Sequence, residues 1–168
     1  MTARRKWLIV VAAGVATIIA STATMPVALV WNASASVPIG LYRVAPARAL
    51  RPGTLVVVRP DAGLARFMAR RRYLETGALL VKPVAATAGQ TVCWHGHVVT
   101  IDWRLAAIAL DADSTGRPLP LWLGCRRLAP GMVFLLAPAV RTSFDGRYFG
   151  PVATSRIVGR ALPVWTRP

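Results

Sequence analysis

The chain has 168 residues, of which 21 are Lys or Arg and only 6 are Asp or Glu, so its formal net charge is +15. Without its apolar N-terminal run, the chain is long enough for one domain with its own core. Such an excess of basic residues suits binding to either nucleic acid or anionic lipid headgroups. No zinc-finger, helix-turn-helix or RNA-binding signature is present, which disfavours specific nucleic-acid binding, and the few carboxylates and histidines argue against paired-carboxylate hydrolysis and a His-dependent serine triad.

The chain begins with a basic cluster followed by a long apolar run. The basic residues 4–6 precede the uncharged residues 7–25. At about 1.5 Å per residue, a helix of this length nearly crosses a hydrocarbon core of about 30 Å, and Trp7 and Trp31 suit its two interfaces. The basic residues on the N-terminal side predict that the N-terminus stays in the cytoplasm.

These features predict three segments: a cytoplasmic N-terminus at residues 1–6, a transmembrane anchor at 7–30, and a periplasmic domain at 31–168 of an inner-membrane protein. The alternative is a cleavable signal peptide, because Ala33-Ser34-Ala35 resembles a small-residue cleavage site. The apolar run exceeds the roughly 7 to 15 residues that are typical of signal peptides, which favours a retained anchor.

A serine-containing stretch follows the apolar run. Residues 31–44 read WNASASVPIGLYRV, in which Ser34 and Ser36 lie on the same side of an extended segment. Pro38 restricts the residue before it and Gly40 permits a turn, so Ser36 should have a well-defined backbone. In one interpretation, one hydroxyl attacks a carbonyl while the other donates to the oxyanion. In the other, the stretch is a polar loop after the anchor.

The rest of the chain alternates short strand-like runs with turns that contain Pro and Gly, which predicts an all-β domain. The expected strands are residues 41–44, 54–59, 78–84, 91–93, 97–101, 132–137 and 156–164, with a turn-rich connection at 111–120. Residues 64–74 break the pattern and predict a helix with an intensely basic side, which either faces solvent or touches lipid phosphate.

Lys82 is the only lysine after Lys6, because every other basic residue beyond that point is arginine. A lysine can lose its proton when it is desolvated, whereas an arginine does not, so Lys82 is a candidate general base. The alternative is an edge-strand lysine that discourages aggregation. Taken together with Ser36, Lys82 indicates a serine-lysine dyad.

Cys93 and Cys125 are far apart in the sequence, and their spacing is not that of a metal site. An exported domain predicts a disulfide between them, worth roughly 3 to 4 kcal/mol by loop entropy, whereas a cytosolic domain predicts buried free thiols. His95 and His97 occupy a predicted hairpin tip, where nothing nearby completes a metal set. We therefore expect neither a metal nor another cofactor.

Four segments, in this order, resemble the type I signal peptidase (S26) family of serine-lysine endopeptidases, and more closely its conjugative-transfer branch, the TraF-type peptidases that mature pilin. They are N-x-S-x-S-x-P-x-G-L-Y at 32–42, LLVKPVAATAG at 79–89, GRPLP at 116–120 and SFDGRYFGP at 143–151. The ordered set is specific and covers nearly the whole chain. It implies a mainly β, signal-peptidase-like antiparallel domain with one N-terminal transmembrane helix.

The resemblance also implies a role for each matching side chain. These roles are Ser36 as nucleophile, Lys82 as general base, Ser34 as oxyanion-hole donor, Ser143 as the hydroxyl that orients the lysine, and Asp145 with Arg147 as a supporting ion pair. The chain departs from general signal peptidases at two places. Only Val37 separates Ser36 from Pro38, a spacing that the conjugative branch shares, and Pro83 follows the lysine where arginine is common.

The function implied by the resemblance is processing of a membrane-embedded pilin precursor, with cyclisation as a further outcome in the conjugative branch. One alternative is a general type I signal peptidase that removes leader peptides from secreted preproteins. The second is a noncatalytic, basic, membrane-anchored component of a transfer apparatus. The partners expected for the peptidase are its membrane-embedded substrate and an anionic phospholipid surface, without specific nucleic acid.

Overall fold

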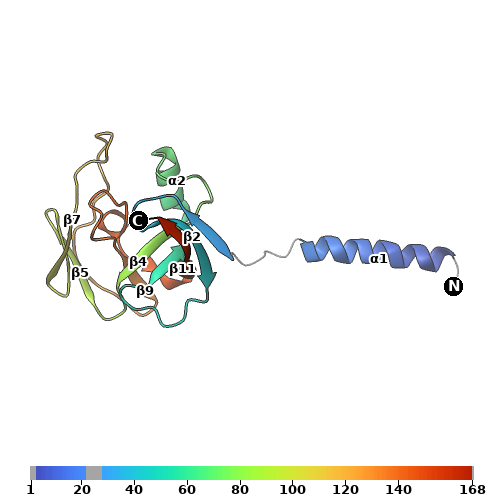
Figure 1. Cartoon of the computed structure of the whole chain (residues 1–168). Helices are drawn as coiled ribbons and strands as arrows, with labels where there is room; N and C mark the ends of the chain where they lie inside the picture. The colour runs from blue at the N-terminus through green and yellow to red at the C-terminus, as the bar shows by residue number, and fades with distance from the viewer. Residues whose placement is uncertain (1–2, 22–27, 168) are drawn as a thin grey trace.

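The computed structural model of the protein describes residues 3–21 and 28–167. Helix α1 (Ala3–Ser21) comes first and lies apart from the sheets (Figure 1). In these two ranges, no helix combines the length and the apolar character needed to cross a membrane. The predicted anchor at 7–30 includes residues 22–27, which lie outside the described residues, so the anchor stays a prediction.

The end of the predicted anchor differs from the structure. Leu29 and Val30 belong to strand β1 (Leu29–Asn32), which pairs antiparallel with β2 (Ile39–Ala45). The β-branched Val30 and the aromatic Trp31 favour an extended backbone, and the pairing with β2 satisfies backbone groups that a helix would have bonded internally. These residues are therefore part of the β domain.

The main body is a seven-stranded antiparallel sheet with the strand order β1-β2-β11-β3-β4-β9-β10. Besides β1 and β2, its strands are β3 (Leu55–Val58), β4 (Leu80–Ala86), β9 (Met132–Leu135), β10 (Val152–Ala153) and β11 (Ile157–Arg167). The interior strand β3 is a continuous Leu and Val run, and β4 is apolar apart from Lys82, as expected for strands covered on both faces. The prediction of a mainly β, antiparallel fold is confirmed.

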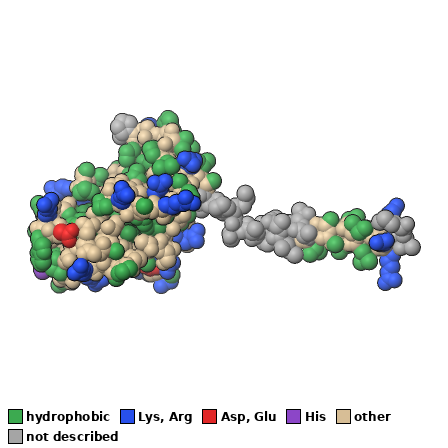
Figure 2. Space-filling view, turned by 90° about the horizontal axis from the view of Figure 1, so that it is seen from below, with side chains coloured by type: hydrophobic (Ala, Val, Ile, Leu, Met, Phe, Trp, Pro, Cys, Tyr) green, Lys and Arg blue, Asp and Glu red, His purple; other side chains and the backbone are tan. Residues whose placement is uncertain are grey.

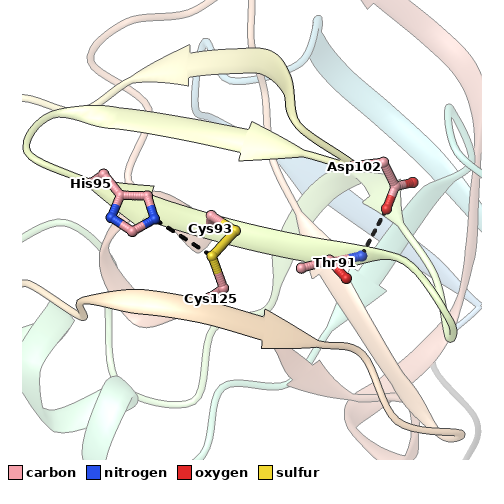
Figure 3. Close-up of a disulfide and its surroundings, with 5 residues drawn as sticks. All are labelled: Thr91, Cys93, His95, Asp102 and Cys125. Carbon is pink, nitrogen blue, oxygen red and sulfur yellow. Dashed lines mark hydrogen bonds between the residues drawn. A yellow bond between two sulfur atoms is a disulfide. The ribbon is translucent and has the colours of Figure 1, made fainter.

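A second, four-stranded sheet has the order β7-β6-β5-β8 and lies on the side of the domain away from α1 (Figure 1). Its strands are β5 (Thr91–His95), β6 (Val98–Ile101), β7 (Arg104–Ile108) and β8 (Gly124–Arg127). The β5–β6 hairpin was predicted and is confirmed. Cys93 lies directly opposite Cys125 in the β5–β8 pair, and the two form a disulfide (Figure 3).

Two α-helices and a short 3-10 helix connect the strands. Helix α2 (Ala62–Arg70) begins where the Asp61 side chain accepts a hydrogen bond from Leu64 N, and it buries Met68 while Arg66 and Arg70 stay exposed. Helix α3 (Gly146–Phe149) begins at Asp145 in the same manner. The 3-10 helix η1 (Thr154–Arg156) leads into β11. The basic helix predicted at 64–74 is thus present in a shorter form.

The two sheets share one apolar core. Val92, Trp94 and Val99 of the small sheet pack with Phe134 of β9 and Tyr148 of α3. Arg and Lys side chains cover much more of the surface than acidic ones do, as the face in Figure 2 shows. The core therefore holds α3 and the segment before it at the junction of the two sheets.

Candidate active site

The turn that joins β1 to β2 carries both candidate serines. Asn32, which is only 5% exposed, bonds to the backbone of this turn through its side-chain amide. At the far end of the turn, Gly40 runs so close to the Trp165 carbonyl of β11 that a Cβ would collide with it. Glycine at this position therefore lets β11 support the base of the turn.

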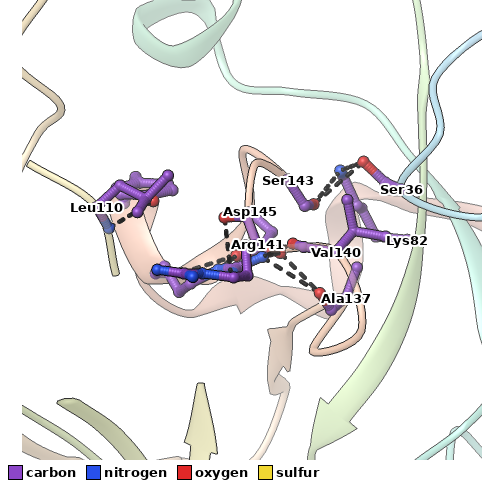
Figure 4. Close-up of polar contacts among 10 residues, drawn as sticks. Ser36, Lys82, Leu110, Ala137, Val140, Arg141, Ser143 and Asp145 are labelled. Atoms are coloured by element: carbon purple, nitrogen blue, oxygen red, sulfur yellow. Dashed lines mark hydrogen bonds and ion pairs between the residues drawn. The ribbon is translucent and has the colours of Figure 1, made fainter. Parts of the chain in front are cut away.

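Lys82 lies in the middle of β4, between β3 and β9, and is 3% exposed. Its Nζ is 2.5 Å from Ser36 Oγ and 2.9 Å from Ser143 Oγ, and the two hydroxyls are 3.1 Å apart (Figure 4). The alternative of an edge-strand lysine is wrong, because β4 is an interior strand. Residues far apart in the chain thus form a triangle of one amine and two hydroxyls.

The environment of Lys82 lowers its pKa to about 8. The main cause is burial, which disfavours the charged ammonium. The carboxylate of Asp145 raises this pKa and the guanidinium of Arg147 lowers it. About one amine in ten is therefore neutral at pH 7, far more than for a lysine with its ordinary pKa, and able to accept a proton.

Asp145 and Arg147 form a completely buried ion pair, with Arg147 Nη2 and Asp145 Oδ2 2.8 Å apart. The Arg147 guanidinium also donates to the carbonyls of Ala137, Val140 and Arg141, while Asp145 accepts from Ala137 N. This dense bonding fixes the loop between β9 and α3, which carries Ser143 (Figure 4). The pair thereby supports the hydroxyl that contacts Lys82.

Ser34 contacts neither Ser36 nor Lys82 by any hydrogen bond in the described part of the chain. Its exposed hydroxyl instead donates to Asn32 Oδ1 at 3.1 Å. Ser34 and Ser36 nevertheless line the same cleft. The backbone N–H of Ser36 also has no hydrogen-bond partner within residues 3–21 and 28–167. In the described part of the chain, the Ser36 N–H is thus a free donor of the turn, whereas the Ser34 hydroxyl is engaged with Asn32.

A cleft of about 1320 Å³ opens in front of Ser36 and Lys82. Strand β1, the start of β4, the end of α2 and the loops before α3 and β8 contribute to its walls. Its apolar lining includes Met68, Tyr73, Leu110 and Phe144. The cleft is large enough for several residues of an extended peptide.

Sequence reasoning missed two residues that shape this site. Asn32 organises the serine turn, and the only signals for it were its status as the single asparagine and its place in the quoted motif. Asp113 accepts a hydrogen bond from Tyr73 Oη, a long-range contact that local pattern could not reveal. Both residues act on the cleft from outside the triangle of Ser36, Lys82 and Ser143.

Metal-ligating side chains gather at one place in the described ranges, Cys93 with His95 and Cys125. Both sulfurs are engaged in the disulfide, and His95 Nε2 lies 3.5 Å from Cys125 Sγ (Figure 3). This cluster is on the small sheet and contributes no residue to the cleft. The candidate active site is therefore built from hydroxyls, one amine and backbone donors.

Comparisons with known proteins show the family of the chain. The profile of the family "signal peptidase, peptidase S26" matches residues 3–166. Plasmid transfer protein TraF of Escherichia coli is 30% identical over 167 residues, which cover 94% of each chain. Conjugal transfer protein TraF of Agrobacterium fabrum is 35% identical over 144 residues, covering 80% of this chain and 81% of its own.

Among solved structures, a signal peptidase I from Enterococcus faecalis aligns with a TM-score of 0.40 at 17% identity, covering 68% of this chain and 97% of that one. The family profile, by contrast, spans nearly the whole chain. The TraF relatives also match along most of their own length. This chain belongs to the signal peptidase family, peptidase S26.

Proposed function

We propose that the protein is a membrane-anchored serine endopeptidase that processes a conjugative pilin precursor, with Ser36 as nucleophile and Lys82 as general base. The observation that carries the proposal is the 2.5 Å separation between Ser36 Oγ and Lys82 Nζ, at an amine that is almost fully buried. A serine hydroxyl needs such an adjacent base to become an effective nucleophile. Burial supplies that base, because it favours the neutral amine.

In the proposed reaction, neutral Lys82 takes the hydroxyl proton while Ser36 Oγ attacks the scissile carbonyl. Lys82 then gives this proton to the leaving amine as the C–N bond breaks, and an acyl-enzyme remains on Ser36. In the second step Lys82 takes a proton from the incoming water or amine, and the Ser36 hydroxyl recovers a proton when its ester bond breaks. Ser143 holds the Lys82 amine in line through its 2.9 Å contact.

The oxyanion of each tetrahedral intermediate is bound by the Ser36 N–H and by the Ser34 hydroxyl. The free Ser36 N–H supports this role, because preorganised donors aimed at the developing charge are a large source of catalysis. For Ser34, the role requires its proton to turn from Asn32 Oδ1 toward the oxyanion. Asp145 and Arg147 have a supporting role only, since they contact the loop that carries Ser143.

The choice of substrate rests on the relatives, whose names are those of plasmid and conjugal transfer proteins. A pilin precursor is the membrane-embedded polypeptide of such a system, and the long cleft fits an extended segment of it. Attack on the acyl-enzyme by water gives a linear product, whereas attack by the precursor's own N-terminus gives a cyclic one. Both outcomes use the same first step.

We further place the protein in the inner membrane, with α1 as part of the anchor and the β domain in the periplasm. The side chains of Trp7 to Val11 in α1 are mostly exposed, as lipid contact requires. Trp31 and Trp165 stack at 5.8 Å on the domain surface, each 51% exposed, which suits a membrane interface. The net positive charge favours anionic headgroups.

The proposal is tested by incubating the purified protein with the candidate pilin precursor and measuring product masses. We expect Ser36→Ala and Lys82→Ala to abolish processing, with Ser155→Ala, an exposed serine of η1, as the matched control that keeps it. A product lighter than the linear one by one water identifies cyclisation. Equal processing of unrelated secreted preproteins supports the general signal peptidase, and full activity of Ser36→Ala refutes the peptidase.

A further inference from the structure

Asn32 is the only asparagine of the chain, and its buried side chain takes part in five hydrogen bonds, all of them within the turn that carries Ser34 and Ser36. We propose that Asn32 is a positioning residue, which holds the nucleophile turn and the Ser34 hydroxyl in their working geometry. The inference deepens the proposed peptidase function and rests on it. It assigns Asn32 no contact with substrate.

The amide nitrogen of Asn32 faces three carbonyls of the turn. Nδ2 is 2.7 Å from the carbonyl oxygen of Ser34, 3.1 Å from that of Val37 and 3.2 Å from that of Pro38. An amide has only two N–H groups, so two of these acceptors share one hydrogen. The three carbonyls flank Ser36 on both sides in the chain, and Asn32 therefore fixes the backbone before and after the nucleophile.

The amide oxygen of Asn32 faces the other side of the turn. Oδ1 accepts from the backbone N–H of Ser34 at 3.3 Å and from its hydroxyl at 3.1 Å. The orientation of the amide is determined by these partners, because a flipped side chain would set its oxygen against three carbonyls. One residue thus sets the positions of both the proposed nucleophile and the proposed oxyanion donor.

The bond to Ser34 is the one that must change during the reaction. Ser34 has a single hydroxyl proton, and in the structure it is donated to Asn32 Oδ1. When negative charge develops on the substrate oxygen, the proton turns toward it, since a charged acceptor makes the stronger bond. Asn32 keeps its bonds to the Ser34 N–H and to the turn carbonyls after this proton has turned, so its loss should misplace the nucleophile and the oxyanion donor in the transition state. We therefore expect a lower kcat with KM nearly unchanged.

The matched control comes from the same turn. Tyr42 Oη donates to the Pro38 carbonyl at 2.6 Å, so Tyr42→Phe removes one bond of the turn without touching Ser34. Asn32→Ala removes the whole network. Asn32→Asp keeps the size of the side chain and the acceptor for Ser34, but it replaces the donor to the three carbonyls with a second oxygen.

The experiment measures kcat and KM of the full-length protein on the pilin precursor for these variants, with circular dichroism to verify folding. We expect Asn32→Ala to lower kcat on the order of 100-fold, as displacement of a reacting group by about 1 Å does. Tyr42→Phe should lower kcat far less than Asn32→Ala does. Asn32→Asp should also lose kcat, and it carries the test if Asn32→Ala does not fold. The inference is overturned if the folded Asn32 variants keep kcat within about threefold of wild type.

A double-mutant comparison tells whether Asn32 acts by positioning the Ser34 hydroxyl or only by supporting the backbone of the turn. If Asn32 positions the Ser34 hydroxyl, the loss in Asn32→Ala with Ser34→Ala is smaller than the product of the two single losses. Independent losses contradict that part of the inference. Amide hydrogen exchange of residues 33–37 provides a readout that needs no catalysis. Faster exchange in Asn32→Ala than in Tyr42→Phe supports the inference even if wild type fails to cleave, a failure that would count against the peptidase alone.

Discussion

Lys82 occupies a position where an ammonium ion is poorly solvated. Burial is the main reason why its pKa falls from 10.5 to about 8, with a raising effect of Asp145 and a lowering effect of Arg147. Since the folded pKa lies below the unfolded one, the buried charge destabilises the protein below pH 8. The free energy of unfolding should accordingly rise as the pH increases from about 8 to 10.5.

This shift predicts how activity depends on pH. Only the neutral amine accepts the Ser36 proton, so kcat/KM should rise about tenfold per pH unit below pH 8 and level off above it. A kcat/KM profile on the precursor measures this limb. Lys82→Arg should be inactive throughout, because its guanidinium keeps its proton. A wild-type rate that stays constant below pH 8 contradicts the role of Lys82 as base.

The buried pair of Asp145 and Arg147 predicts a large loss of stability. Asp145→Asn leaves the Arg147 charge buried without its counter-ion, and the free energy of unfolding should fall by about 3 to 5 kcal/mol. Urea unfolding measures the change. Asp111→Asn is the matched control, since its contact with His97 is exposed and should be worth no more than about 1 kcal/mol. Equal effects of the two substitutions contradict the prediction.

At the scale of elements, one wall of the cleft is a polar cluster that joins the end of α2 to the loop before β8. It consists of Tyr73, Asp113 and Arg117, and we call it the latch. Tyr73 follows α2 and donates to Asp113, and Arg117 donates to the same carboxylate oxygen at 2.8 Å. The Tyr73 ring packs on Phe144, the residue after Ser143, with centroids 5.1 Å apart. The latch thus connects the loop at 111–120 to the loop that carries Ser143.

Asp113→Ala should open this wall. Burial raises the pKa of the Asp113 carboxyl, but hydrogen bonds from Tyr73, Thr115 and Arg117 outweigh that effect and hold the pKa well below its usual value. The stabilisation is complete above the unfolded pKa of about 3.9 and is lost only as the pH falls through the lower folded value. We therefore expect KM for the precursor to rise several-fold at neutral pH, with kcat nearly unchanged. Unchanged KM contradicts the latch.

The sequence predicted the elements that have a strong hydrophobic pattern. It missed the elements whose pattern is weak or only a few residues long. The Val-rich residues 54–59 and the apolar residues 132–137 correspond to β3 and β9. Strand β8 reads GCRR, which lacks any alternation, and α3 has only four residues. Strand β8 forms because it pairs with β5, which is a tertiary contact, whereas α3 is a single turn that begins at the local Asp145 cap.

In the candidate site, too, some residues could be identified from local sequence and others could not. Lys82 was identifiable because it is the only lysine in an arginine-rich domain, and Ser36 because it lies between small residues and Pro38. The role of Ser143 came from resemblance alone. Its position beside Lys82 depends on the pairing of β4 with β9 and on the buried Arg147, which no local window contains. Long-range packing is what composition and periodicity leave undetermined.

For the whole molecule, the small sheet and the seven-stranded sheet that carries Lys82 unfold together if their shared core is the main connection. Trp94 of β5 packs against Trp122, which donates to the Gly146 carbonyl of α3 at 2.9 Å. Damage to the small sheet should therefore reach α3 and the loop that holds Ser143. The disulfide is the natural place to test this coupling, because it crosslinks β5 to β8 without lining the cleft.

The double variant Cys93→Ala with Cys125→Ala should lose about 3 to 4 kcal/mol of unfolding free energy. The crosslink closes a loop with a sequence separation of 32, and its removal returns that loop entropy to the unfolded chain. Urea unfolding is monitored with two readouts, Trp fluorescence for the packing of the core and precursor processing for the candidate site. A single shared transition at lower urea is expected. If processing and Trp fluorescence are lost at different urea concentrations, the two sheets are not one cooperative unit.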